Sequence, residues 1–274
     1  MIPLLQMQKT ESARPKRAVG FIYGVPMDQL RLGMLQYDPV WCEISTNQRK
    51  VESLLAGAPE TDLLVLPEMS LTGFCMDAPR AHLDAAHHEW FAELARRHKT
   101  GIVYGCVEQG GNRSVLLDRS GARVGSYDKR HLFGLGGEPS SYRPGVETPV
   151  WHFEDWRIRP SICYDLRFSY HYWQSATEID LALVPACWPA SREAHWRLLL
   201  AARAVENQFY VAGVNRIGVE PQQQYVGASL LVDPNGAVLC DAQSEEGIFV
   251  NTISLEVVKR QRARFPFLRD RVEA

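Results

Sequence analysis

Runs of apolar residues along the chain predict an alternation of strands and helices. The segment 31–39 (RLGMLQYDP) alternates apolar and polar positions up to a proline, which is typical of a strand. The run 62–68 (DLLVLPE) is short and continuously apolar, as expected for a strand that is buried on both faces. Between 80 and 99 the apolar residues share one face of an amphipathic helix.

The rest of the chain continues this alternation. We predict further helices at about 45–57, 168–177, 191–207 and from 255 onward. Further strands are predicted at 101–109, 113–118, 122–128, 150–155, 156–165, 180–186, 209–217, 226–233 and 247–254. Strands that alternate with helices imply an α/β protein with largely buried sheets. No low-complexity linker interrupts the pattern, so we expect one domain over 28–274, preceded by a loosely ordered N-terminal extension, 1–27.

Charge and hydropathy exclude several kinds of partner. The formal net charge is −2 and the pI is near 6.5, so no basic field favours nucleic acid or anionic lipid. No apolar run approaches the length of a membrane span. The segment 1–27 lacks the long apolar stretch of a secretory signal. We therefore expect a cytoplasmic protein that binds neither nucleic acid nor membrane.

The cysteines match neither a zinc site nor a compact disulfide framework. Six are present and none forms a C-x-x-C pair. Several lie in apolar runs, so buried free thiols in a reducing compartment are the expected state. A redox protein is disfavoured because no vicinal pair occurs. No cluster of histidines and carboxylates has metal-ligand spacing, so no metal is expected.

Three reactive side chains each follow a predicted buried strand. They are Glu68 after LLVLP, Lys129 after VGSYD and Cys163 after PSI. In α/β folds the carboxyl ends of strands carry catalytic groups, because loops converge there over rigid supports. Each position alone is weak, since a strand-end carboxylate or lysine is usually solvated and a cysteine there is usually inert.

As a set, the three residues form a complete hydrolytic site. A thiol attacks as thiolate and needs a nearby base or positive charge. Glu68 can accept the thiol proton and later return it to a leaving amine. Lys129 can hold its charge beside the oxyanion, and the backbone N–H of Tyr164 is placed to be a second donor. Such a site needs no metal and no organic cofactor.

Four motifs around these residues resemble the nitrilase superfamily of carbon–nitrogen hydrolases. They are LVLPEMSLTGF, YDKRHLF, ICYDLRF and AHW…ARAVENQFYVAG, in the order and at the spacing typical of that family, over about residues 31–268. The resemblance implies a four-layer α-β-β-α sandwich, with Glu68, Lys129 and Cys163 as its catalytic triad. Glu138, in GGEPSSYRPG, falls where many members carry a second glutamate near the active site. The family also implies a homodimer or higher homo-oligomer, formed through the outer helices near the nucleophile.

The residues after the cysteine narrow the implied reaction. CYDLRF looks like the amidase branches, whereas nitrile-hydrolysing members typically have Trp-Glu there. The match is strongest to omega-amidases, which release ammonia from small monoamides such as 2-oxoglutaramate or succinamate. Alternatives are another amidase of the superfamily, acting on deaminated glutathione or an N-carbamoyl compound, or a non-catalytic scaffold with the same fold.

A substrate with a free carboxylate needs cationic or hydroxyl partners across the pocket from the thiol. Candidates in loops after strands are Tyr142, Arg143, Trp188, Arg192 and His195. We expect Arg167 instead to form a structural ion pair with a neighbouring acid, and His131 to be a structural hydrogen-bond partner.

Overall fold

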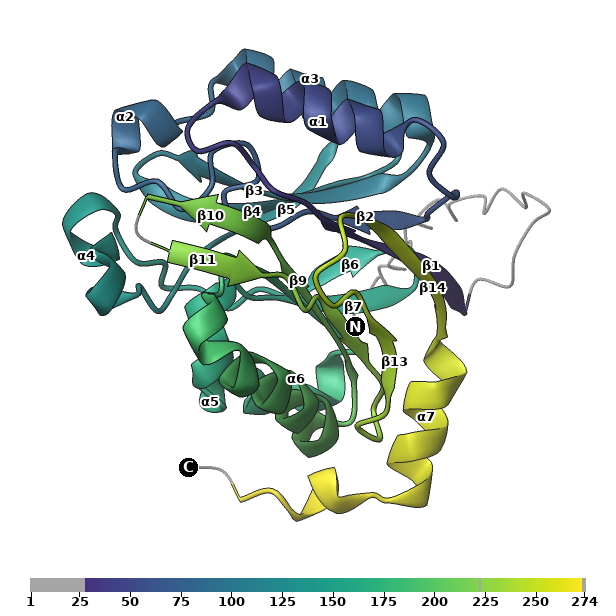
Figure 1. Cartoon of the computed structure of the whole chain (residues 1–274). Helices are drawn as coiled ribbons and strands as arrows, with labels where there is room; N and C mark the ends of the chain where they lie inside the picture. The colour runs from purple at the N-terminus through teal and green to yellow at the C-terminus, as the bar shows by residue number, and fades with distance from the viewer. Residues whose placement is uncertain (1–27, 222, 273–274) are drawn as a thin grey trace, which may run out of the picture.

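Two six-stranded β-sheets lie face to face at the centre of the molecule (Figure 1). The computed structural model describes residues 28–221 and 223–272, so the expected extension 1–27 lies outside the described residues. The first sheet has the order β14-β1-β2-β3-β4-β5. Its strands are β1 (Gln29–Gln36), β2 (Leu63–Val65), β3 (Gly101–Glu108), β4 (Gly111–Leu117), β5 (Arg123–Asp128) and β14 (Gly247–Ser254).

The second sheet has the order β13-β12-β9-β8-β7-β6. Its strands are β6 (Trp151–Phe153), β7 (Trp156–Pro160), β8 (Leu181–Ala186), β9 (Tyr210–Asn215), β12 (Leu230–Val232) and β13 (Val238–Asp241). A separate hairpin follows β9 and is formed by β10 (Ile217–Glu220) and β11 (Gln223–Val226). The central strands β1, β2 and β3 run parallel, as do β7, β8 and β9.

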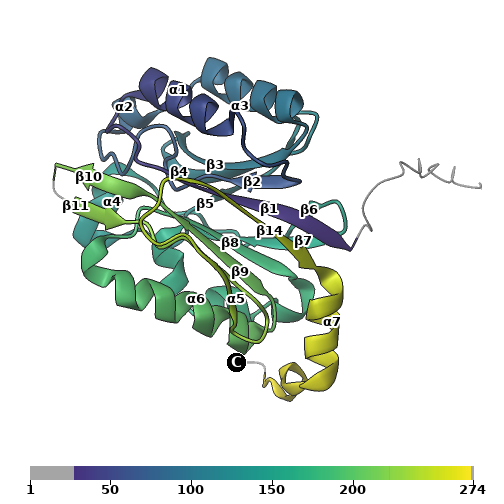
Figure 2. The ribbon, with the colours of Figure 1, turned by 45° about the vertical axis from the view of Figure 1, so that its right-hand side comes forward.

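Helices cover the outer face of each sheet and complete four layers (Figure 2). The first sheet is covered by α1 (Ile44–Leu55) and α3 (Ala85–His98), and the second by α5 (Tyr170–Trp173) and α6 (Glu193–Asn207). The short α4 (Glu138–Ser141) and the β10–β11 hairpin lie at one end of the molecule, while α7 (Leu255–Arg264) lies at the other (Figure 1). The predicted α-β-β-α sandwich is confirmed.

Strand burial on both faces explains the continuous apolar runs. In β2, Leu63 and Val65 join the cluster between the two sheets, while Leu64 faces the cluster beneath α1 and α3. In β1, Leu32 and Leu35 divide between the same two clusters. Each fully buried aliphatic side chain contributes about 1.5–3 kcal/mol relative to exposure. Both faces of these strands therefore stabilise the sandwich.

Two predicted elements differ from the structure. The helix expected over 80–99 is divided into α2 (Ala78–Ala81) and α3, because the Asp84 side chain caps α3 by accepting hydrogen bonds from the N–H groups of Ala86 and His87. The helix expected at 168–177 is reduced to α5 and a 3₁₀ turn (Ala176–Glu178). The sequence pattern also missed β13 and the β10–β11 hairpin.

The arrangement of parallel strands brings distant segments to one edge. Glu68 follows β2, Lys129 follows β5, and Cys163 follows β7. The backbone N–H of Cys187, after β8, donates a 2.8 Å hydrogen bond to Glu68 Oε2 and so joins the two sheets at this edge. The carboxyl ends of strands from both sheets therefore surround one site.

Candidate active site

The Glu68 segment can pass close to β3 because residue 105 of that strand is a glycine, which has no side chain. A Cβ on Gly105, in β3, would lie 2.4 Å from the backbone nitrogen of Met69 and 2.9 Å from Glu68 Cα. Met69 itself has a φ of 47°, so the chain turns sharply directly after the glutamate. Glycine at 105 is therefore what allows the Glu68 segment to pass so close to β3.

Lys129 lies between two glutamates, and all three side chains are buried. Its Nζ is 2.8 Å from Glu68 Oε1 and 2.7 Å from Glu138 Oε2. Asn112 Nδ2 donates to both carboxylates, at 2.7 Å to Glu68 Oε1 and 2.7 Å to Glu138 Oε1. The N–H of Phe133 donates to Glu138 Oε2 at 2.6 Å. Unpaired charges at this depth would be costly, so the network holds all its members in fixed positions.

Cys163 is the first residue of a 3₁₀ turn (Cys163–Arg167), which begins shortly after the end of β7 at Pro160. Its φ of 45° is in the left-handed region, which is unusual for a residue with a side chain. The buried Asp165 supports this turn by accepting hydrogen bonds from Ile162 N–H at 2.9 Å and Tyr127 Oη at 2.7 Å. His131 adds a contact from Nδ1 at 2.7 Å, the structural hydrogen bond expected from the sequence.

Burial and charge keep the Cys163 thiol neutral at rest. Burial raises the pKa of this thiol well above its usual value, the negative charge of Glu68 raises it further, and Lys129 opposes both. For Lys129, burial alone would lower the pKa, but Glu68 and Glu138 raise it well above the usual value. The lysine is therefore an ammonium ion. The thiol can become a nucleophile only when a base accepts its proton in the site.

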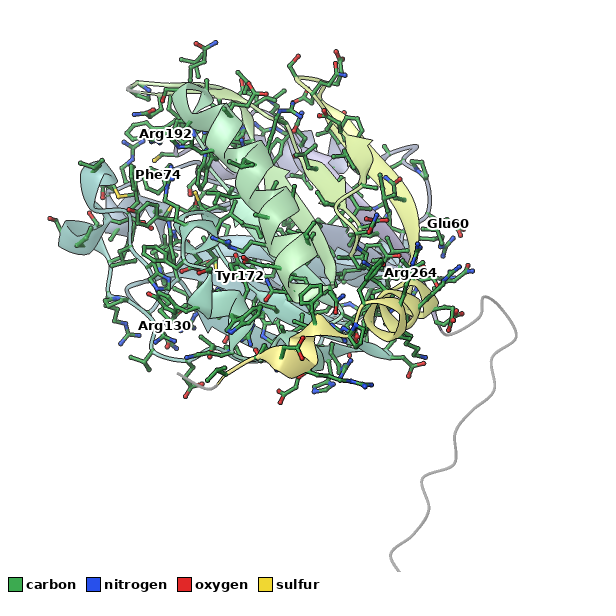
Figure 3. The ribbon with its side chains drawn as sticks, turned by 90° about the horizontal axis from the view of Figure 1, so that it is seen from below. Glu60, Phe74, Arg130, Tyr172, Arg192 and Arg264 are labelled. Atoms are coloured by element: carbon green, nitrogen blue, oxygen red, sulfur yellow. The ribbon has the colours of Figure 1, made fainter. Side chains whose placement is uncertain are left out.

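A cavity of about 470 Å³ opens above Cys163 and Lys129. Six aromatic residues contribute to its walls: Trp41, Phe74, Phe133, Tyr164, Trp188 and Tyr225. Arg167 and Arg192 supply two guanidinium groups, and both side chains are only partly buried. Phe74 and Arg192 come from opposite halves of the chain yet lie at the same end of the molecule (Figure 3).

The structure places only part of the expected pocket at this cavity. Trp188 and Arg192 line it. Tyr142, Arg143 and His195 are not among the lining residues. The hydroxyl of Tyr142 donates to the carbonyl of Cys75, and Arg143 and His195 are exposed.

The expectation for Arg167 is wrong. Among residues 28–221 and 223–272, no carboxylate forms an ion pair with it. Its guanidinium lies 4.7 Å from the centre of the Trp188 ring and 5.8 Å from that of Tyr164, where it forms part of the cavity wall. The buried Asp165, two residues away, already accepts hydrogen bonds from Ile162 N–H and from Tyr127 Oη in β5.

Sequence reasoning missed three features of the site. Asn112 and the backbone N–H of Cys187 hold Glu68, and the β10–β11 hairpin contributes Glu220 and Tyr225 to the cavity. A polar residue at the start of an apolar strand was the available signal for Asn112. No group of His, Cys, Asp or Glu side chains in the described part of the chain is arranged to hold a metal ion. No helix within residues 28–221 and 223–272 is both long and apolar enough to cross a bilayer.

A family model described as carbon–nitrogen hydrolase matches residues 31–263. The chain belongs to this family. It is 38% identical over 253 residues to the omega-amidase YafV of Yersinia enterocolitica, covering 89% of this chain and 97% of that protein. It is 32% identical over 253 residues to a 2-oxoglutaramate amidase of Bacillus subtilis (strain 168), covering 87% and 96%. The predicted family and the predicted class, an amidase of the nitrilase superfamily, are confirmed.

Solved structures agree with this assignment. A CN-hydrolase superfamily protein from Xanthomonas campestris, which carries an arsenic adduct in its active site, superposes with a TM-score of 0.85 at 33% identity, covering 90% of this chain and 98% of that one. Saccharomyces cerevisiae Nit3, a nitrilase-superfamily member, gives a TM-score of 0.78 at 21% identity, covering 89% and 97%. The second likeness concerns the fold alone.

Proposed function

We propose that this amidase releases ammonia from the terminal amide of a small ω-monoamide such as 2-oxoglutaramate or succinamate. The observation that carries the proposal is the presence of two guanidinium groups, Arg167 and Arg192, in the wall of the cavity that contains Cys163. A guanidinium group binds a carboxylate with charge-assisted hydrogen bonds. The names of the relatives from Yersinia and Bacillus support the same substrate class.

The depth of the charges suggests how such a substrate is oriented. Cys163 and Lys129 are buried, with 7% and 0% of their surface exposed, whereas Arg167 and Arg192 are only partly buried. The amide then points inward to the thiol, and the carboxylate stays near the opening. The aromatic walls between the two ends leave room for a short, unbranched chain.

In the proposed reaction, Cys163 Sγ attacks the amide carbon while Glu68 accepts the thiol proton. The negative charge that develops on the carbonyl oxygen is stabilised by the ammonium of Lys129 and the backbone N–H of Tyr164. Glu68 returns the proton to the departing nitrogen, and ammonia leaves behind a thioester on Cys163. Water, deprotonated by Glu68, then attacks the thioester and releases the carboxylic acid and the thiol.

Glu138 has a positioning role in this proposal. It accepts hydrogen bonds from Lys129, Asn112 and Phe133 N–H and shares the first two donors with Glu68. Glu138 therefore fixes the ammonium at the distance from Glu68 that the reaction needs. Replacing Glu138 by glutamine keeps the shape but removes half of the negative charge beside Lys129.

The first experiment compares substrates. Ammonia release is measured with 2-oxoglutaramate and succinamate, and turnover with an N-carbamoyl amino acid and deaminated glutathione. We expect the two monoamides to be preferred, and Cys163→Ala to abolish turnover. Turnover of the carbamoyl compound alone would contradict the proposed substrate class, and full activity of Cys163→Ala would contradict the proposed nucleophile.

The second experiment tests the carboxylate site. Arg167→Met and Arg192→Met each remove a charged donor worth about 1.5–3 kcal/mol, so we expect KM for succinamate to rise about 10- to 100-fold. A neutral amide such as propionamide should be affected little. Arg197→Met is the matched control, because Arg197 forms ion pairs with Glu193 and Asp241 and is not in the cavity wall. Equal losses on both amides would contradict the role of the two arginines.

We further propose that the chain forms a homodimer in the cytoplasm. The outer surface of α6 supports a dimer, because two large apolar side chains are exposed there that a partner could cover: Leu198 is 69% exposed and Val205 46%. Six cysteines, all present as free thiols, support a reducing compartment. Light scattering on a Leu198→Glu/Val205→Glu variant tests the dimer, and a wild-type mass equal to that of one chain would contradict it.

A further inference from the structure

Two cysteines that are far apart in sequence meet at the rim of the active-site cavity. Cys42 Sγ lies 2.6 Å from Cys75 Sγ. Cys42 is in the turn before α1, with a φ of 57°, and Cys75 is in the loop between β2 and α2. The backbone N–H of Cys42 donates a 2.8 Å hydrogen bond to the carbonyl of Thr72, so the two loops are also joined through their main chains.

Both loops supply walls of the cavity. Trp41 directly precedes Cys42, while Phe74 and Met76 flank Cys75, and all three line the cavity. Arg80 strengthens this rim, because its guanidinium lies 5.2 Å from the centre of the Trp41 ring. A bond between the two sulfurs would therefore tie together two sides of the site without involving Cys163.

We propose that Cys42 and Cys75 are a reversible dithiol–disulfide pair that cross-links these two loops of the cavity wall. The oxidant is a low-molecular-weight disulfide such as glutathione disulfide. The Cys42 thiolate attacks one of its sulfurs, which forms a mixed disulfide and expels one thiolate. The Cys75 thiolate then attacks Cys42 Sγ and expels the second thiolate. The two cysteines lose two electrons and two protons, and the small disulfide is reduced to two thiols.

The exposure of the two thiols determines this order of attack. Cys42 is partly exposed and Cys75 is fully buried, so only the former can meet the oxidant. The thiol of Cys75 contacts the carbonyl of Asp77 at 3.7 Å, which leaves its sulfur facing Cys42. Because the sulfurs are already in contact, the second step is intramolecular and needs little movement of either loop.

The first step is expected to be slow at neutral pH. Burial and, to a lesser extent, the hydrogen bond with Cys75 raise the pKa of Cys42 to about 12, against the opposing charge of Arg80. Only a small fraction of Cys42 is then thiolate at pH 7. Oxidation should therefore be slow at neutral pH and should accelerate as the pH is raised.

The test uses the full chain with Cys163→Ala, which removes the proposed nucleophile and leaves five of the six thiols. The protein is equilibrated at pH 8.5 for one day with glutathione buffers of increasing disulfide content, then denatured and alkylated. We expect five alkyl groups in the reduced protein and three in the oxidised protein, with peptide mapping showing a Cys42–Cys75 link. The melting temperature should rise by roughly 5–10 °C on oxidation, since the link closes a loop of about 33 residues.

Two further variants serve as matched controls in the same background. Cys42→Ser should abolish the cross-link, and Cys240→Ser should retain it, because Cys240 lies in β13 and not in either loop. Three outcomes would overturn the proposal. They are five alkylated thiols even in excess glutathione disulfide, a link between other cysteines, and a melting temperature that falls on oxidation.

Discussion

Replacing Lys129 by methionine removes the positive charge that lies between Glu68 and Glu138 while keeping most of the side-chain volume. The ammonium is 2.8 Å from one carboxylate and 2.7 Å from the other, and none of the three side chains is exposed. The variant leaves both carboxylates buried without a cation. Asn112 remains as a shared donor, but an amide group cannot balance two negative charges.

The expected loss of stability follows from this burial. Removing one partner of a buried ion pair costs about 3–5 kcal/mol, mainly because the remaining charge is left unpaired. For a chain of this size, 1 kcal/mol corresponds to a change of about 2–4 °C in melting temperature. We therefore expect Lys129→Met to melt roughly 6–20 °C below the wild type, and to be inactive.

Urea unfolding at pH 7, followed by tryptophan fluorescence, measures the loss. The matched control is Lys259→Met, which replaces an exposed lysine on α7 and should change stability by no more than about 0.5 kcal/mol. Adding Glu138→Gln to Lys129→Met removes one of the two repelling carboxylates and should restore part of the loss. A Lys129→Met protein as stable as the control would refute the reasoning that this ammonium compensates buried carboxylates.

Three further predictions follow from the site. Because burial and Glu68 raise the pKa of Cys163, its alkylation by iodoacetamide, taken as the difference from Cys163→Ala, should be slower than that of a free thiol at pH 7 and still be rising at pH 9. Gly105→Ala should lower the urea midpoint and activity, since its Cβ would lie 2.4 Å from Met69 N, whereas Gly134→Ala, with nothing within 4 Å, should not. Burial would raise the pKa of Asp165, but the hydrogen bond with His131, together with those from Ile162 N–H and Tyr127 Oη, lowers it. Ionised Asp165 therefore stabilises the fold fully above about pH 3.9, and this contribution is lost as the pH falls through its lower folded-state pKa. In acid, the free energy of unfolding should therefore decrease less steeply with falling pH in Asp165→Asn than in the wild type.

Local sequence patterns predicted those elements whose own residues show which faces are buried. The strand at 62–68 was predicted because β2 is apolar on both faces, and the family motifs implied the four layers. The helix predicted over 80–99 was too long. The side chain of Asp84 caps the N-terminus of α3, although the apolar periodicity of a helix continues through this position. The hairpin at 217–226 was missed because its polar residues carry no signal of a buried strand.

The residues of the site also fall into two groups: those that the sequence could predict and those that only the tertiary structure reveals. Glu68, Lys129 and Cys163 could be selected because each directly follows a strand, and strand ends are visible in the sequence. Asn112 and Cys187 N–H act on Glu68 from other strands, so only the tertiary structure brings them together. Arg167 was assigned to an ion pair because sequence spacing does not show that Asp165 is already satisfied by nearer donors. The same holds for Cys42 and Cys75, which are separated by 33 residues and were treated as isolated thiols.

The balance of charge in the buried network also bears on which substrates the site can accept. One ammonium faces two carboxylates, so the interior beside Cys163 already carries more negative than positive charge. A second carboxylate brought there by a substrate would be repelled. Arg167 and Arg192, nearer the opening, supply the only guanidinium groups in the cavity wall among the described residues. This arrangement favours an amide that enters first, with the carboxylate held outside, and it disfavours a substrate whose two acidic groups flank the scissile bond.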